Sequence, residues 1–99
     1  MVNVILRQEA IDDLNSIWIY TFEKWSESQA DKYYETIKFA CKEIGRNPNL
    51  GKEYTTISRH LLGLKSGKHI IFYNLISDTK VEVIRILHQR MELKNRLTE

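Results

Sequence analysis

The sequence predicts an α+β fold in which a hairpin of two helices packs on a mostly antiparallel sheet. Residues 8–44 contain two successive apolar stripes at three- and four-residue spacing, which is typical of amphipathic helices. Residues 59–88 contain three β-rich runs separated by short turn sequences. A strand precedes the helices and a short helix should follow the last strand, so the expected order is β-α-α-β-β-β-α.

The first strand is expected over residues 2–7, "VNVILR", which are rich in β-branched side chains. From Gln8 the period changes, and the apolar side of a first helix consists of Ile11, Leu14, Ile17, Trp18, Thr21, Phe22 and Trp25. Asp12 and Asp13 lie in its first turns and suit the positive end of the helix dipole. We expect Trp18 and Trp25 to pack in the core rather than to form a ligand cage.

The second helix should begin after Ser26, because Ser26-Glu27-Ser28-Gln29 fits a capping box. Gly45 is expected to end it in a left-handed conformation, and Pro48 prevents its continuation. The link between the helices is short, so they should form an antiparallel hairpin. The apolar side of this second helix consists of Ala30, Tyr33, Tyr34, Ile37, Ala40, Cys41 and Ile44, with Cys41 expected as a buried, unreactive thiol.

The rest of the chain is expected to form a polar connection, three strands and a final helix. Residues 49–58 read as the connection, and the strands are "RHLLGLK", "KHIIFYNLI" and "KVEVIRILH". Ser66-Gly67 and Ser77-Asp78-Thr79 supply the turns between them. A short helix over 90–97 would place Met91, Leu93 and Leu97 on its apolar side. The sequence has no repeat and no second domain, so residues 1–99 should form a single domain.

Two of the strands are apolar on both faces, which predicts cover on both sides of the sheet. The middle strand presents Ile71, Tyr73 and Leu75 on one face, and on the other Ile70, Phe72 and Ile76. Strict alternation in the last strand sets Val81, Val83 and Leu87 opposite Ile84 and Ile86. Because one helical hairpin covers only one face, part of the second face is expected to remain as a binding surface.

Composition indicates a soluble cytoplasmic protein. The N-terminal "MVNVILRQEA" lacks the sections of a signal peptide, and no apolar run approaches the roughly 20 residues of a membrane span. A single cysteine is consistent with a reducing compartment. Residues 1–44 carry five Lys/Arg and eight Asp/Glu, a net charge of −3, and residues 45–99 carry ten and five, a net charge of +5. The basic second half suits an acidic protein partner or a position near nucleic acid.

Motifs for common active sites are missing. The sequence contains no Gly-rich phosphate loop, no Cys/His cluster and no Gly-x-Ser-x-Gly, and the three histidines lack metal-ligand spacing, so no metal and no cofactor is expected. A metal-free ribonuclease would need a base, an acid and cations for the phosphate. Residue types of this kind surround the predicted sheet, but they would also form a basic interaction face: Arg59, His60, Lys65, Lys68, His69, Arg85, His88 and Arg90.

The segment "GLKSGKHIIFYNLISDTKVEVIRILHQRMELKNRL" resembles the C-terminal half of ParE toxins, in the RelE/ParE toxin–antitoxin superfamily. The distinctive pieces are residues 69–73 and 85–91, and the order of elements and the helical hairpin also match. This resemblance implies a toxin of a type II toxin–antitoxin system that causes growth arrest and stabilises plasmids. It further implies inhibition of DNA gyrase without chemistry of its own and neutralisation by a ParD-like antitoxin in a hetero-oligomer, with no sequence-specific nucleic-acid binding and no membrane partner.

The runner-up is a ribosome-dependent messenger RNA endonuclease of the RelE type. Nucleases of that branch commonly carry an arginine just after the position of His69 and a tyrosine near the chain end. Here Ile70 occupies the first position and no tyrosine follows Tyr73, so no catalytic residue is assigned. A degenerate member that only binds an antitoxin is a third reading. Target-binding residues are expected to be Arg59, His60, Lys68, His69, His88, Arg90 and Met91, while Arg85 is expected to be a structural charge.

Overall fold

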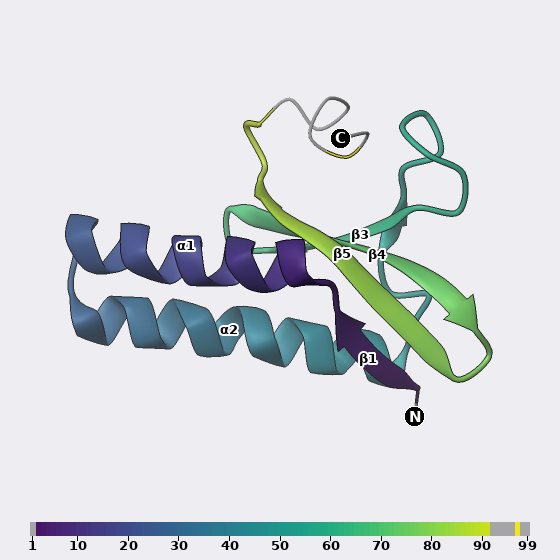
Figure 1. Cartoon of the computed structure of the whole chain (residues 1–99), viewed down its shortest axis with the longest axis horizontal. Helices are drawn as coiled ribbons and strands as arrows, with labels where there is room; N and C mark the ends of the chain where they lie inside the picture. The colour runs from purple at the N-terminus through teal and green to yellow at the C-terminus, as the bar shows by residue number, and fades with distance from the viewer. Residues whose placement is uncertain (1, 92–96, 98–99) are drawn as a thin grey trace.

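The computed structural model describes residues 2–91 and residue 97 and confirms the α+β class. Figure 1 shows two antiparallel helices, α1 (Gln8–Lys24) and α2 (Glu27–Arg46), lying beside one sheet. Its strands are β1 (Asn3–Leu6), β2 (Lys52–Glu53), β3 (Leu62–Ser66), β4 (His69–Ser77) and β5 (Lys80–His88). They are ordered β1-β5-β4-β3-β2, and only β1 and β5 pair in parallel. The hairpin and the order of the first six predicted elements are as expected, with β2 as an additional strand.

The ends of α2 differ in how well the sequence predicts them. Ser26 caps the helix as expected, since its hydroxyl accepts a hydrogen bond from the Gln29 N–H at 3.1 Å. The prediction that Gly45 ends the helix in a left-handed conformation is wrong, because α2 continues to Arg46. A Cβ on Gly45 would lie only 3.0 Å from Val4 Cγ2. This glycine is needed for the close approach of the first strand rather than for a turn.

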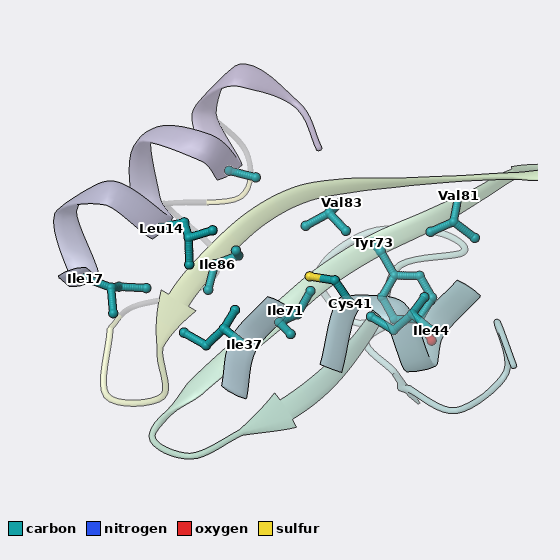
Figure 2. Packing of buried hydrophobic residues seen from close by; sticks show 11 residues of the cluster. Leu14, Ile17, Ile37, Cys41, Ile44, Ile71, Tyr73, Val81, Val83 and Ile86 are labelled. Atoms are coloured by element: carbon teal, nitrogen blue, oxygen red, sulfur yellow. The ribbon is translucent and has the colours of Figure 1, made fainter. Parts of the chain in front are cut away.

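The larger core cluster lies between the hairpin and one face of the sheet. Tyr73 is fully buried there, but its hydroxyl donates to the Pro48 carbonyl at 2.7 Å and accepts from the Gly51 N–H at 2.8 Å. Both bonds fasten the segment after α2 to the core. Cys41 is buried as predicted, and this burial raises the pKa of its thiol to about 11, which disfavours the reactive thiolate. Figure 2 shows this cluster, which includes Leu14, Ile17, Ile37, Cys41, Ile44, Ile71, Tyr73, Val81, Val83 and Ile86.

Strand β5 contains a bulge that the sequence pattern does not reveal. Phe72 pairs with Arg85 and Tyr73 pairs with Val83, so Ile84 has no partner in the register. The bulge shifts the alternation of side chains by one residue. Ile86 therefore joins Val83 in the cluster under the hairpin, whereas Ile84 and Leu87 lie in the second cluster. The predicted placement of Ile86 and Leu87 by strict alternation is wrong for this reason.

The second face of the sheet is partly covered by the segment predicted to be a polar connection. Within that segment β2 pairs with β3, and Tyr54 and Ile57 pack on the second cluster together with Leu61. This cover is not predicted by the sequence, in which residues 49–58 read as a polar connection, and it adds to any cover from the expected C-terminal helix. That helix, predicted over 90–97, lies for most of its length outside the described residues, but Leu97 also packs on the cluster. At the far end of β4, Leu75 and Ile76 remain exposed.

The end of the hairpin extends beyond the sheet (Figure 1). Trp25, at the end of α1, is 71% exposed, so its predicted place in the core is wrong. Trp18 lies at intermediate exposure, whereas Tyr33 and Tyr34 of α2 do pack against the core. The apolar side predicted for α1 is therefore only partly confirmed, because Ile11 and Phe22 are also exposed, at 38% and 46%. Neither helix in the described part of the chain is suited to span a membrane.

Candidate interaction site at the end of the sheet

The turn between β3 and β4 lies beside the end of β5. His69, the first residue of β4, pairs with His88, the last residue of β5. The Gln89 N–H donates to the Lys68 carbonyl at 2.9 Å, which fastens the chain after β5 to the turn. Of the predicted target-binding residues, the structure therefore brings together Lys68, His69 and His88, with Arg90 and Met91 following directly along the chain. We refer to Tyr33, Lys68, His69, His88 and Arg90 as the strand-end cluster.

Tyr33 of α2 is the central polar contact of this cluster, whereas its helical period predicts only a place on the core side of the helix. Its hydroxyl oxygen lies 2.6 Å from His69 Nδ1 and accepts a hydrogen bond from the Lys68 N–H at 3.1 Å. The hydroxyl also donates to the Ser66 carbonyl at 3.2 Å. Gly67 has a φ of 60°, and a Cβ there would lie 2.6 Å from Tyr33 Cε1. This position of the turn thus requires glycine, both for its positive φ and because the Tyr33 ring occupies the space of a Cβ.

The two histidines of the cluster are held in different ways. Burial, followed by the charge of His88, lowers the pKa of His69 to about 4, against a smaller opposing effect of Asp13. His69 is therefore neutral at neutral pH. His88 Nδ1 accepts the Arg90 N–H at 3.1 Å, and the two imidazole rings meet edge to face with centroids 5.2 Å apart. Lys68 and Arg90 are exposed, so the cluster presents two cations around the two imidazole rings.

The neighbouring residue Ile70 points into the second core cluster and is only 7% exposed. This is the position at which the nuclease branch would carry a phosphate-binding arginine. An apolar side chain packed against Phe72 and Leu87 supplies no charge to a phosphate. In the described part of the chain, moreover, no group of three His, Cys, Asp or Glu side chains is placed to hold a metal ion.

Arg85 forms a bidentate salt bridge with Asp13 of α1. Its Nε and Nη2 donate to the two carboxylate oxygens of Asp13 at 2.8 and 3.0 Å. Asp13 also accepts the Ile86 N–H at 2.9 Å, so one carboxylate joins α1 to both the side chain and the backbone of β5. Through these contacts Asp13 holds helix α1 against strand β5 of the sheet.

Arg59 and His60 lie apart from the strand-end cluster. Both precede β3, whereas the cluster lies at the other end of that strand, roughly 15 Å away at about 3.3 Å per residue. His60 has a φ of 62° and is exposed. The structure therefore divides the predicted target-binding residues between two places.

Comparison with known proteins identifies the family. A family model described as the ParE toxin of the type II toxin–antitoxin system parDE matches residues 4–93. This chain belongs to the ParE toxin family. The resemblance seen in the sequence is thereby confirmed, and the match extends over both the hairpin and the strand-end cluster.

Curated relatives carry the same family name. Toxin ParE1 of Mycobacterium tuberculosis is 30% identical over 93 residues, covering 94% of this chain and 95% of that protein. Toxin ParE1 of Caulobacter vibrioides is 30% identical over 92 residues, covering 93% and 94%. A solved chain described as part of a chromosomal ParDE TA system from P. aeruginosa has a TM-score of 0.77 at 16% identity, covering 89% of this chain and 96% of that chain, so the two share a fold.

Proposed function

We propose that this ParE-family toxin acts in the cytoplasm by binding and inhibiting DNA gyrase, without catalysing a reaction, and that a ParD-like antitoxin neutralises it. The observation that carries the proposal is the family match over residues 4–93. The buried Ile70 supports binding rather than phosphodiester cleavage, because the cation needed beside a reacting phosphate is replaced by an apolar contact.

We propose that the strand-end cluster contributes to the contact with gyrase. Lys68 and Arg90 are exposed, Met91 is 42% exposed, and the bonds made by Tyr33 and Gln89 hold the backbone beneath them. A rigid base that displays two cations and an apolar side chain suits recognition of an acidic protein surface.

For the antitoxin we propose the open part of the second sheet face. Leu75 and Ile76 are exposed at the adjoining end of β4, and the buried Asn74 Oδ1 has no hydrogen-bond partner among the described residues. An amphipathic antitoxin helix would cover the apolar side chains and could donate a hydrogen bond to Asn74. Support for such a partner comes from the solved chain that shares the fold, which is described as part of a ParDE system.

The decisive experiment measures gyrase and messenger RNA in parallel. Purified toxin should block supercoiling of relaxed plasmid by gyrase and ATP, and the antitoxin should restore it, while messenger RNA stays intact in a translating extract. The alternative, a ribosome-dependent endonuclease, gains some support from the Tyr33–His69–His88 arrangement, which places acid–base groups together. Codon-positioned cleavage that disappears in His88→Ala would establish that alternative and overturn the gyrase proposal.

A further inference from the structure

Charge is divided unevenly between the two layers of the fold. The hairpin, residues 8–46, carries eight Asp/Glu and five Lys/Arg. Residues 54–77, which form the loop before β3 and the strands β3 and β4, carry Arg59, Lys65 and Lys68 and no Asp or Glu. The loop packs on the second face of the sheet, away from the hairpin (Figure 1). The protein therefore has an acidic side and a basic side, and a polyanion would approach the basic side.

Two lysines of the basic side lie on adjacent strands and on the same face of the sheet. Lys52 of β2 pairs with Gly63 of β3, and Lys65 follows two residues after Gly63, so both lysines are on the second face. Their Cα atoms are roughly 8 Å apart, from a strand spacing of about 4.8 Å and a rise of about 3.3 Å per residue. Lys52 Nζ lies 5.9 Å from the centroid of the Tyr54 ring, which itself contacts Phe72 edge to face. Both lysine side chains are exposed.

Two further exposed cations extend this pair in opposite directions. Arg59 lies in the loop before β3, and Lys68 lies in the turn after it, beside the strand-end cluster. From the level of Gly63 to that of Lys68 the distance along the strand is roughly 16 Å. With the described residues none of the four cations forms an ion pair, so their charges are available to a ligand. We call these residues the basic track: Lys52, Arg59, Lys65 and Lys68.

The basic track has no exposed aromatic ring of Phe, Tyr or Trp beside it. In the described part of the chain, the exposed aromatic side chains are Tyr20, Phe22, Trp25 and Phe39, and all four lie on the hairpin or at its link. Proteins that hold single-stranded nucleic acid stack its bases on exposed aromatic rings. A duplex keeps its bases stacked inside and presents its phosphates outward, where cations contact them without reading the sequence. The basic track therefore suits the backbone of a duplex rather than the bases of a single strand.

We infer that the basic track binds the phosphate backbone of double-stranded DNA, the abundant duplex of a cell, independently of its sequence. The amino and guanidinium groups would donate to phosphate oxygens, and binding would release counterions from the duplex. DNA bound in this way lies on the side of the sheet opposite the acidic hairpin, so repulsion by the hairpin carboxylates is small. The inference concerns direct contact between this chain and DNA and does not depend on gyrase being the target.

Fluorescence anisotropy of a labelled DNA duplex of roughly 30 base pairs, titrated with the full chain, tests the inference. With about four phosphate contacts, the slope of the logarithm of the association constant against the logarithm of the salt concentration should be about −3 to −4. Two duplexes of unrelated sequence should bind equally, and a single-stranded RNA of the same length should bind more weakly. Absence of saturable binding at roughly 50 mM salt, a strong preference for one sequence, or binding of the single strand as tight as that of the duplex overturns the inference.

Variants locate the binding. Lys52→Gln combined with Lys65→Gln removes two exposed charges outside the strand-end cluster. It should raise the Kd of the duplex at least about tenfold at roughly 50 mM salt and make the salt slope shallower by about 2. The matched control, Lys24→Gln with Lys42→Gln, removes two exposed charges from the hairpin and should change the Kd less than about threefold. Circular dichroism should show an intact fold in both variants. Equal losses of affinity in the two variants mean that net charge alone sets the binding, which overturns the inference.

Discussion

Asp13→Ala should destabilise the toxin strongly, because one carboxylate serves three donors. It accepts bonds from Arg85 at 2.8 and 3.0 Å and from the Ile86 N–H at 2.9 Å. The Arg85 and Asp13 side chains are 21% and 15% exposed. Removing one member of a fully buried ion pair costs about 3–5 kcal/mol, and the residual exposure of both side chains lowers this cost, so we expect about 2–3 kcal/mol here.

Urea unfolding followed by circular dichroism measures this loss of unfolding free energy. Two further variants serve as comparisons. Asp13→Asn keeps an acceptor of similar shape and should cost less, about 1–2 kcal/mol. Glu82→Ala breaks the Arg7–Glu82 pair, which is short at 2.7 Å but has side chains 43% and 27% exposed. That control should cost at most about 1 kcal/mol. If Asp13→Ala costs no more than Glu82→Ala, the argument that the Asp13–Arg85 contact ties α1 to the sheet is refuted.

Three further predictions concern the strand-end cluster. Arg90→Ala should weaken gyrase inhibition in a supercoiling assay while leaving the melting temperature nearly unchanged, and an unfolded variant would instead make Arg90 structural. Since the pKa of His69 falls from 6.5 to about 4 on folding, the unfolded chain binds the extra proton between these values. The unfolding free energy, fully present above about pH 6.5, should therefore decrease towards pH 4 by on the order of 2–3 kcal/mol. Urea titrations should show this slope reduced in His69→Gln and retained in the exposed His60→Gln. Gly67→Ala should lower stability by more than about 1 kcal/mol, measured as a drop in melting temperature, because φ is positive and Tyr33 fills the space a Cβ needs.

The sequence predicts the layers of this fold well because helical and strand periods are local properties. It does not predict the bulge at Ile84, since an extra residue in a strand leaves composition unchanged and shows only in the pairing with β4. The cover of the second sheet face is also missed. Tyr54 and Ile57 stand among polar residues without a regular period, and only the folded arrangement packs them against the second cluster.

The candidate site was partly predictable for a related reason. His69 and His88 are marked by their places at the start and end of adjacent apolar runs, and antiparallel pairing then brings them together. Tyr33 lies more than thirty residues earlier in the chain. Its helical period indicates that it faces inward, but its hydrogen bonds to the β3–β4 turn depend on how α2 crosses the sheet, which no local pattern specifies.

The strand order has a consequence for synthesis on the ribosome. β5 lies between β1 and β4, so the strand made last occupies a place between the first strand and its own predecessor. Until residues 80–88 have left the exit tunnel, β1 has no partner and the side chains of α1 have little to pack against. A nascent or truncated toxin that ends before β5 therefore lacks both the paired sheet and the strand-end cluster. The chain can complete its fold only after β5 has been synthesised and has left the tunnel.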